Sequence, residues 1–487
     1  MSWKISRITI TLYLLLAVAG KGLAAGVLPT GKSEYEFIYD NLERIDALSS
    51  DYFNYHLGPY SFEKTEFAWG PFESLKNIKC KRVELFGFVR EDFRAAREAS
   101  GQGFESFRGG LALAPSKKLF VYANFVLDER KAQDDSYHGK KWRGLAGSVE
   151  EAFGYYRSGP IAVTVGRFAS FWGPRGSLVL SSRVAMDGFG YTFHWGRLAL
   201  SYRLARLDGL SPDSDGTEQF ENRYFAGHRF DIFLSRWLQI GLFETVIFGG
   251  PGRQVELFYL NPLIFYHGAQ LNEDTNDNTF LGFDFSFKPK AGIKLYGQLL
   301  VDDFQIDRKS QGDEEPDEIG FFTGFYLADL LPSFDLKAEY SRVANWTFNQ
   351  IHERNRYLYN NQLIGGALGN DYDLARASFI RWFDNSIAAS LNFIYARQGE
   401  GSVTDEWTSP WLLITGDYNE PFPTGAVQKT TSTVINIKGF FRNHFYFDVD
   451  AGVDWVSNFD HTSGDNRSIP FVNLRISSFF STTLSVE

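Results

Sequence analysis

Groups that suit the recognition of carbohydrate are concentrated between residues 249 and 277. Aromatic rings stack on the apolar faces of sugar rings, while amide and imidazole groups hydrogen-bond to sugar hydroxyls. The residues of this stretch that we predict to contact a polysaccharide are Tyr259, Asn261, Tyr266, His267, Gln270 and Asn272. The structural alternative is that Asn261 and Pro262 form a turn and that the aromatic rings belong to a membrane-interface girdle. For the stretch as a whole we expect a role in binding or in occluding a channel.

A second candidate occupies residues 166–176, with the sequence GRFASFWGPRG. It leaves an apolar run and enters a loop containing glycine and proline. Arg167, Trp172 and Arg175 would combine ring stacking with guanidinium contacts, which suits an acidic glycan. The alternative is a tight turn at a membrane rim, with Trp172 in the interface.

Signatures of catalysis and of metal binding are missing from the sequence. It has no G-x-S-x-G, H-E-x-x-H, paired C-x-x-C or phosphate-binding glycine motif, and its eight histidines show no close ligand spacing. We therefore predict no enzyme activity, no metal and no cofactor. An enzyme whose Ser–His pair is assembled in space is a further alternative. The net charge of -10 argues against nucleic acid as a partner.

The elements that would carry these residues are β-strands with one apolar face. In residues 444–455 apolar residues alternate with polar ones, so that one face suits lipid and the other suits a wet lumen. The chain is 17% aromatic but has no apolar run of the length that a membrane-spanning helix needs. A transmembrane β-barrel accounts for both observations, because only every second strand residue faces lipid.

Connections of two lengths alternate along the chain. Tight connections are predicted near 114–117, 158–160, 196, 236–237, 288–291, 329–332, 384–386 and 443. Long ones are predicted at 91–103, 128–147, 169–189, 207–227, 248–277, 305–319, 345–372, 398–431 and 457–468. Short periplasmic turns and long extracellular loops alternate in this way. We predict an all-β fold, a transmembrane outer-membrane β-barrel of about 18 antiparallel strands over residues 81–487, with both ends in the periplasm.

The N-terminal residues 1–25 have the features of a secretory signal peptide. A basic start is followed by an apolar run over 8–19 and by small residues at a cleavage site. Residues 26–80 are predicted to form a periplasmic segment with one clear helix over 33–48, where apolar residues recur at helical spacing. We expect this helix to lie on the periplasmic side or to plug the barrel. Cys80 is the one cysteine and is expected to be a small core residue.

One predicted pair conflicts with a lipid-facing surface. If Arg236 and Trp237 form a turn, His228 and Glu244 lie opposite each other on the outer face of their strands. A bulge near Gly241 or a position at the headgroup rim would remove the conflict. We interpret the pair as structural.

Several motifs resemble those of the Wzi family of outer-membrane capsule assembly proteins. They are GRFASFWGPRG (166–176), HRFDIFLSRWLQIGLFETVIFGG (228–250), LFYLNPLIFYHGAQLN (257–272), DNTFLGFDF (277–285) and LYGQLLVDDFQID (295–307), with a weaker continuation through 336–343 and 365–369. The resemblance implies a barrel of about eighteen strands with small periplasmic helices, which binds capsular polysaccharide and helps to retain it on the cell surface. The family has no agreed catalytic residues to carry over, so the binding residues above are inferred from side-chain chemistry.

Three functions are compatible with this fold. The first is a non-enzymatic, lectin-like attachment protein, monomeric, with capsular or other surface polysaccharide, outer-membrane lipid and lipopolysaccharide as partners. The alternative is a porin or polysaccharide export channel, and the third is the enzyme already mentioned. Large aromatic loops that close the lumen favour attachment, and the length of 248–277 leads us to expect closure by that loop. Because the chain is acidic, an acidic glycan would need local arginines such as Arg167, Arg175, Arg203 and Arg229.

Overall fold

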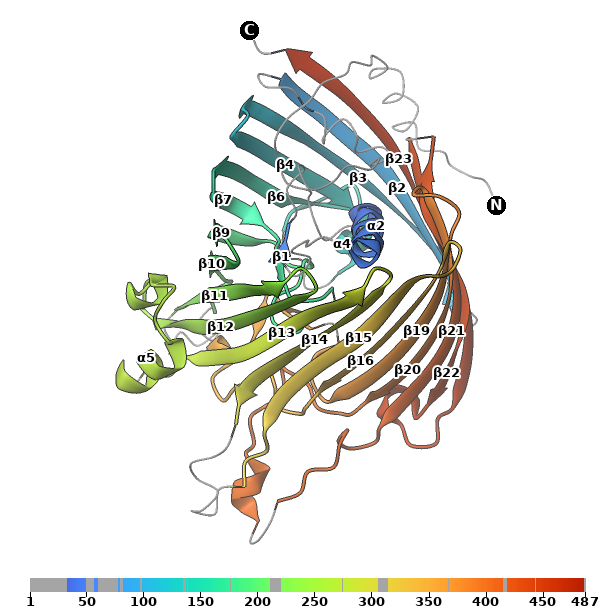
Figure 1. Cartoon of the computed structure of the whole chain (residues 1–487). Coiled ribbons are helices and arrows are strands. Elements are labelled where there is room, and N and C mark those ends of the chain that lie inside the picture. Colours follow the sequence, from blue (N-terminus) through green and yellow to red (C-terminus); the bar gives the residue numbers. More distant parts are fainter. Residues whose placement is uncertain are drawn as a thin grey trace.

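Eighteen antiparallel strands, each paired with its neighbours in chain order, close into a barrel in the computed structural model (Figure 1). The structure describes residues 33–49, 57–59, 78, 82–96, 99–134, 137, 139–175, 177–210, 220–273, 275–304, 314–366, 368–414, 418–442 and 444–485. The barrel strands are β2 (Arg82–Ala96), β3 (Ala99–Ser116), β4 (Leu119–Asp128), β6 (Leu145–Ser158), β7 (Ile161–Phe168), β9 (Met186–Trp195), β10 (Leu198–Arg206), β11 (Glu221–Ser235), β12 (Leu238–Pro251), β13 (Asn278–Lys290), β14 (Ile293–Asp303), β15 (Glu318–Leu331), β16 (Phe334–Val343), β19 (Tyr372–Trp382), β20 (Ile387–Gln398), β21 (Gln428–Phe441), β22 (Phe445–Ser457) and β23 (Arg467–Ser485). The predicted fold class and strand number are confirmed.

Shorter elements lie before the barrel and in its connections. They are α2 (Ser33–Leu48), β1 (Leu57–Gly58), α4 (Glu129–Gln133), β5 (Lys141–Trp142), β8 (Phe171–Trp172), η3 (Phe258–Leu260), α5 (Tyr266–Glu273), η5 (Glu353–Asn355), β17 (Leu358–Tyr359), β18 (Gln362–Leu363), η6 (Pro410–Leu413) and η7 (Phe459–His461). Among the described residues, no helix is both long enough and apolar enough to cross a membrane. The predicted signal peptide, most of the segment 26–80 and Cys80 lie outside the described residues.

The two-residue alternation sets the two faces of each strand. In β22, Asp448 pairs with Arg475 of β23 at 3.0 Å, and Asp450 accepts a hydrogen bond from Asn436 of β21, all on the lumen side. Phe445 and Trp455, which belong to the other face of β22, are exposed on the outer side. The strand predicted over 444–455 is therefore confirmed, with its charged residues in the lumen and its large apolar residues outside.

The tight turns lie at one end of the barrel, here called the short-turn end, and the opposite end is called the long-loop end. Exposed aromatic residues flank the short turns, as they do where a barrel meets a membrane interface. They include Trp195, Trp237, Phe334, Phe383 and Phe441.

The connection between β2 and β3 is shorter than predicted. The two strands stay paired as far as Ala96 and Ala99, so the prediction of a long loop over 91–103 is wrong. The charged residues of this stretch resemble a loop in the sequence. In the structure Asp92 faces the lumen and pairs with Arg475 at 2.8 Å, which is why a polar residue occupies a strand here.

The first and last strands meet in an extended seam. β23 pairs with β2 at fifteen positions, from Arg82 opposite Ser485 to Ala96 opposite Phe471. β23 therefore continues beyond Phe480, and its C-terminal part completes the barrel wall next to the start of β2.

Helix α2 lies inside the ring of strands at the short-turn end (Figure 1). The predicted helix over 33–48 is confirmed with the same bounds. Phe37 packs against Phe440 of β21 with ring centroids 5.4 Å apart, and the hydroxyls of Tyr35 and Tyr122 of β4 lie 3.2 Å apart. The amide of Gly292, in the turn between β13 and β14, donates to the carbonyl of Ala47. The helix therefore plugs this end of the barrel, and we call it the plug helix.

Charged residues bind the plug helix to strands around the circumference. Asp46 lies 2.8 Å from the ammonium groups of both Lys288 and Lys294. Other pairs join Arg44 to Asp335 at 2.9 Å, Glu43 to Lys337 at 3.0 Å and Asp40 to Lys438 at 2.6 Å. These contacts involve β13, β14, β16 and β21, which fixes the helix from several sides.

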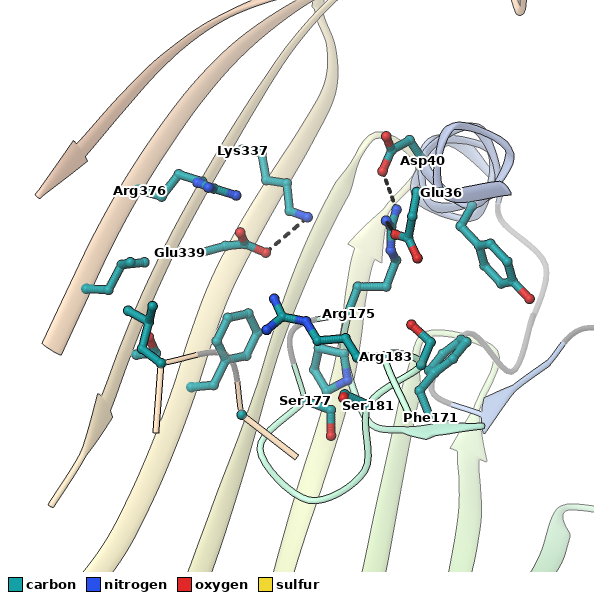
Figure 2. A pocket seen from close by; sticks show the side chains of 18 of the residues that line it. Glu36, Asp40, Phe171, Arg175, Ser177, Ser181, Arg183, Lys337, Glu339 and Arg376 are labelled. Atoms are coloured by element: carbon teal, nitrogen blue, oxygen red, sulfur yellow. Dashed lines mark hydrogen bonds and ion pairs between the residues drawn. The ribbon is translucent and has the colours of Figure 1, made fainter. Parts of the chain in front are cut away.

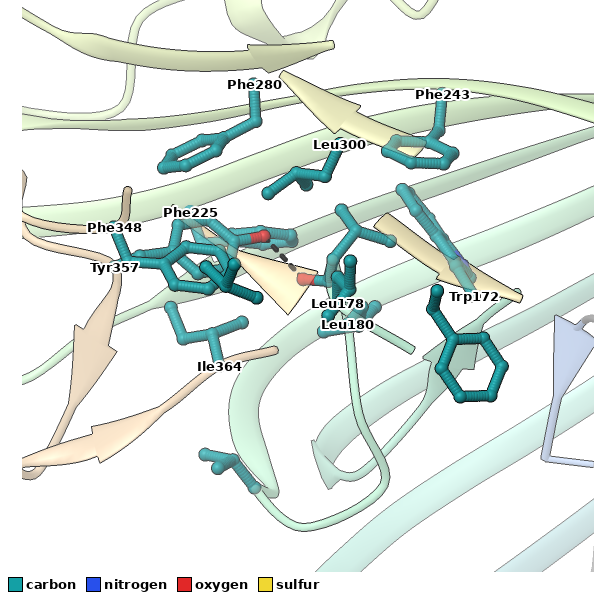
Figure 3. Packing of buried hydrophobic residues seen from close by; sticks show 14 of the residues in the cluster. Trp172, Leu178, Leu180, Phe225, Phe243, Phe280, Leu300, Phe348, Tyr357 and Ile364 are labelled. Carbon is teal, nitrogen blue, oxygen red and sulfur yellow. Dashed lines mark hydrogen bonds between the residues drawn. The ribbon is translucent and has the colours of Figure 1, made fainter. Parts of the chain in front are cut away.

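Two long connections fold into the lumen above the plug helix. They are residues 169–185 between β7 and β9, here called the inward loop, and residues 344–371 between β16 and β19. Figure 3 shows Leu178 and Leu180 of the inward loop packed beside Tyr357 and Ile364. The Tyr357 hydroxyl donates to the carbonyl of Val179 at 2.6 Å. The apolar core of this end of the molecule thus lies inside the barrel.

Candidate functional site

A polar cavity lies between the plug helix and the inward loop (Figure 2). Its volume is about 920 Å³. Arg175 and Arg183 of the inward loop line it together with Lys337, Glu339 and Arg376 of the wall. The remaining lining residues are Glu36, Tyr39, Asp40, Phe171, Pro174, Ser177, Ser181, Ser182, Phe322, Ser341, Gly366, Leu368, Tyr372, Leu374, Lys438 and Arg475. A cavity of this size with cations, hydroxyls and two tyrosines suits a polar, anionic ligand.

Cations outnumber carboxylates around this cavity. Six lining residues are Arg or Lys and three are Asp or Glu. Arg175 binds both Glu36 and Asp40 of the plug helix. Burial alone would raise the pKa of Asp40, but the charges of Arg175 and Lys438 hold it well below its usual range. Asp40 is therefore ionised, and three more cations than carboxylates line the cavity.

A second cavity of about 570 Å³ lies next to the first, toward the long-loop end. Arg475 lines both cavities, and its guanidinium pairs with Asp92 at 2.8 Å and with Asp448 at 3.0 Å. Arg94 and Arg130 also line the second cavity, whose three arginines are matched by Asp92, Asp448 and Asp450. Among the described residues, no group of His, Cys, Asp and Glu side chains could hold a metal ion.

The inward loop contains two of the residues predicted to bind polysaccharide. Trp172 is buried in the apolar cluster, against Gly227 of β11, so its ring faces protein on the lumen side. Arg175 lines the first cavity, where it is bound to the plug helix. Gly365 lets the two lumen loops approach closely, since a Cβ there would lie 1.9 Å from the carbonyl oxygen of Leu178.

The remaining predicted arginines do not join this site. Arg167 lies on the outer face of β7 and pairs with Asp187 of β9. Arg203 is buried against Phe168, with its guanidinium carbon 3.5 Å from the ring centroid. Arg229 is buried between Asp231 and Asp284. Arg203 and Arg229 hold the wall together from the lumen side and are covered by protein, so the expectation that they supply charge to a glycan is wrong.

The other six predicted residues lie in residues 252–277, here called the outer loop. Tyr259 and Tyr266 are fully buried, and the Tyr259 hydroxyl donates to Asp277 at 2.7 Å. The Gln270 amide donates to the carbonyl of Asp277 at 2.7 Å. Asn261, His267 and Asn272 are exposed. These residues gather near one another but far from the lumen cavities, none of which they line.

The outer loop does not close the lumen, contrary to our expectation. Tyr259 and Tyr266 pack on Tyr202, Tyr224 and Phe248, which point out of the barrel. Successive strand residues point to opposite faces. Tyr202 of β10 and Tyr224 of β11 therefore point outward, while Arg203 and Arg229 of the same two strands face the lumen. Closure comes instead from the inward loop and residues 344–371. Loop length indicates how much surface a loop covers but not which side of the wall it covers.

Comparison with known proteins identifies the family. A family model described as capsule assembly protein Wzi matches residues 130–469, well over half of the chain. This chain belongs to the Wzi family. The membership predicted from its motifs is thereby confirmed. No curated protein matches the sequence.

Solved structures show the fold that this Wzi-family chain shares. It resembles a structure described as Wzi, an outer membrane protein involved in group 1 capsule assembly in Escherichia coli and a carbohydrate-binding β-barrel. The identity is 14%, the TM-score is 0.61, and 93% of this chain and 99% of that chain are covered. Pseudomonas aeruginosa OccD3 (OpdP) and OprD match with TM-scores of 0.47 and 0.45, identities of 11% and 10%, and 82% of this chain covered against 91% and 95% of theirs.

This Wzi-family chain also has an aromatic cluster that sequence reasoning missed. Trp346, which follows β16, packs edge-on against Trp407 and Trp411 of the next long loop, with centroids 5.0 and 5.5 Å apart. Tyr418 adjoins Trp411, and its hydroxyl donates to Glu420, which also accepts from the Trp346 indole. The only local sign of this cluster in the sequence is that Trp407 and Trp411 lie four residues apart. Their partner Trp346 is about sixty residues earlier, which the sequence pattern did not connect.

Proposed function

We propose that this chain binds a surface polysaccharide at the outer membrane and holds it there without catalysis, the polysaccharide being capsular where the cell makes a capsule. Membership of the Wzi family supports this, as does the carbohydrate binding for which the E. coli structure is described. The barrel strands, with large apolar residues outside and charges inside, support a place in the outer membrane.

The observation that carries the proposal is a lumen that holds the plug helix and two folded loops and has a cavity lined with cations. The plug helix is fixed to at least four strands by ion pairs, and the two lumen loops lie above it. A porin or export channel needs a continuous water path. The first cavity has an excess of cations that suits an anionic glycan, and the two cavities together have the volume for a short stretch of it. Retention therefore fits the geometry better than conduction.

The proposed glycan path joins the two cavities. Arg183, Arg376 and Arg475 supply guanidinium groups, which form paired hydrogen bonds to carboxylates. At the long-loop end, Trp407 and Tyr418 are partly exposed and supply faces for sugar rings. We also keep the exposed Asn261, His267 and Asn272 of the outer loop, and separately the outward Arg167 of β7, as proposed glycan contacts outside the lumen.

The arrangement across the membrane completes the proposal. Residues 1–25 direct secretion, the segment 26–80 belongs to the periplasmic end, where its plug helix enters the barrel beside the short turns, and the long loops face outward. The chain is monomeric in this scheme and is surrounded by lipid and lipopolysaccharide.

Two measurements test the proposal on the refolded full-length protein. Planar-bilayer recordings should show no steady conductance, and purified host surface polysaccharide should bind saturably. Changing Arg183 and Arg376 to Ala should weaken binding at least tenfold, while the matched control Arg197→Ala, at an exposed short turn, should not. A steady open channel, or binding indifferent to the Arg183 and Arg376 changes, would contradict the proposal.

A further inference from the structure

The outer wall of the barrel has an unusual polar pair. His228 of β11 and Glu244 of β12 lie opposite each other, as predicted, with their side chains 3.4 Å apart on the outer face. The neighbouring outward residues Leu242 and Leu281 are strongly exposed, whereas Glu244 is only 2% exposed. Something therefore covers the wall at the height of the pair. The bulge between β11 and β12 lies near Phe233, so it does not account for the cover.

The cover is the outer loop. The Glu244 carboxylate accepts hydrogen bonds from the amides of Tyr266 and His267, each at 2.8 Å, at the start of α5. The Tyr266 ring lies edge-on to His228 with centroids 4.5 Å apart. A carboxylate on an outer face is thus satisfied by the amino end of a helix, where backbone N–H groups and the helix dipole favour negative charge.

The underside of the outer loop is aromatic and is fixed to the wall. Tyr202 of β10 donates from its hydroxyl to the carbonyl of Tyr259 at 2.9 Å, and Tyr266 donates to the same carbonyl at 3.1 Å. Phe248 stacks on Tyr259 at 4.5 Å. At its base, Arg253 binds Glu256 and Asp277. The outer loop is therefore packed against the barrel wall, with one side on the strands and the other side facing outward.

The outer side of the loop is apolar at its most exposed points. Leu257 is 81% exposed, Leu263 is 74% exposed and Leu271 is 68% exposed, with Phe265 between them. The exposed polar residues between Leu257 and Leu271 are Asn261 and His267, and the exposed carboxylate of Glu273 lies beyond them at the end of α5. Figure 1 shows α5 outside the ring of strands, on the same side as the ends of β11 and β12.

The position of the loop along the strands indicates its depth. Glu244 and Phe248 lie seven and eleven residues beyond Trp237 in the short turn. With about 3.3 Å per residue and a tilt of about 40°, they lie roughly 18 and 28 Å from that end. The apolar band of an outer-membrane barrel is about 25 Å tall. The outer loop therefore spans the outer edge of the lipid-facing band.

We propose that the outer loop is an interfacial anchor, which inserts Leu257, Leu263 and Leu271 among the acyl chains at the outer edge of the bilayer. Lipid is the occupant because these side chains continue the exposed wall formed by Leu242 and Leu281. The outer loop projects from one side of the barrel and fixes the height and tilt of the barrel in the membrane. This inference rests on the leucines of the outer loop and does not depend on the lumen cavities of the polysaccharide proposal.

The test is lipid quenching of a fluorophore. In a Cys80→Ser background, single Leu263→Cys and Leu271→Cys variants are labelled with nitrobenzoxadiazole and reconstituted into phosphatidylcholine–phosphatidylglycerol vesicles with 5-doxyl or 12-doxyl phosphatidylcholine. Leu281→Cys on the wall is the lipid-facing control, and the exposed Glu353→Cys is the water-facing control. A shift in gel mobility on heating verifies that each variant is folded.

We expect both outer-loop positions to be quenched as strongly as Leu281→Cys, and more by the 5-doxyl than by the 12-doxyl lipid. Quenching no greater than that of Glu353→Cys would overturn the proposal. So would self-quenching that rises with protein density in the absence of lipid quenching, because it would show that the face packs against a second copy. Leu257→Cys repeats the test at an independent position.

Discussion

Asp46 shows how single residues fix the plug helix. It is buried at the C-terminal end of α2 and touches the ammonium groups of Lys288 and Lys294, which are also buried. Removal of one member of a buried ionic group leaves the others charged and without compensation, which costs far more than loss of an exposed pair.

Asp46→Ala should therefore lower the free energy of unfolding by roughly 3–5 kcal/mol. Urea titration of the protein in detergent micelles measures the change. The control Glu353→Ala removes a loose, exposed partner of Arg356 and should change it by less than about 1 kcal/mol. Equal effects of the two variants would show that the lysines find other partners.

The pH dependence of the plug helix can be predicted from Glu34. Burial alone would raise its pKa, but Arg90, Arg108 and the Ser477 hydroxyl lower it to about 2 from 4.5. A depressed pKa stabilises the folded state above pH 4.5, and this contribution disappears as the pH falls toward 2. The stability difference between the native protein and Glu34→Gln should thus be constant above pH 5 and shrink between pH 4.5 and 2. Unfolding at a series of pH values measures it, and a difference that does not depend on pH would refute the assignment.

For single residues, the sequence predicted which side chains face each other across a turn better than it predicted which side chains are buried. The opposition of His228 and Glu244 followed from the turn at Arg236 and Trp237, and the structure confirms it. The burial of Trp172 could not be predicted, because its neighbours come from β11 and from the core above it. Local spacing defines which residues face each other across a turn, whereas burial depends on distant segments.

Among the elements, the plug helix and the inward loop form one unit. Arg175 of the loop binds Glu36 and Asp40, on successive turns of the helix. Hydrogen bonds to charged groups contribute more than neutral ones, about 1.5–3 kcal/mol each.

Glu36→Ala combined with Asp40→Ala should release the inward loop. Trypsin should then cut after Arg175 or Arg183 at least tenfold faster in the folded barrel, since a loss of about 1.4 kcal/mol changes an opening equilibrium tenfold. Mass spectrometry of the fragments gives the cleavage site. Asp329→Ala, which removes a partner of Arg44 at a turn away from the loop, is the control and should leave the rate unchanged. Unchanged cleavage in the double variant would mean that the apolar contacts of the loop hold it alone.

The elements themselves were predicted well, but their placement was not. The helix over 33–48 and the alternating strands followed from periodicities of 3.6 and 2. The position of the helix inside the barrel depends on pairs such as Asp46 with Lys288, which are separated by 242 residues. The charged lumen face of β2, with Arg90, Asp92 and Arg94, resembles a loop in the sequence, because a wet lumen reverses the usual rule that charge marks an exposed connection.

On the scale of the whole molecule, the strand ladders are unequal in length. The seam between β2 and β23 has fifteen described pairs, whereas β6 and β7 share seven, from Ala152 opposite Arg167 to Ser158 opposite Ile161. Each ladder contributes backbone hydrogen bonds that a bilayer interior cannot replace.

A chain that ends after Phe480 should still close, because ten of the fifteen seam pairs remain. We expect a lower temperature for the heat-induced mobility shift on a gel, because the pairs of Arg82 to Phe86 are lost. Removal of residues 486 and 487 alone, which lie beyond β23, should leave that temperature unchanged. A truncated chain that never shows the folded mobility would mean that the last five residues are needed for closure itself.

The unequal lengths of the strand ladders determine where two neighbouring strands of the barrel can separate. Backbone groups that lose their partners inside a bilayer are costly, so a wall resists parting most where its ladder is longest, and here the junction of the first and last strands is the longest ladder of the barrel. The shortest ladder, between β6 and β7, lies on one side of β7, and the ladder on its other side has eight described pairs; the inward loop begins at the end of β7. In the proposed function, a polymer bound in the lumen would not leave sideways through this long seam, and its path would follow the barrel axis toward the long-loop end, away from the plug helix.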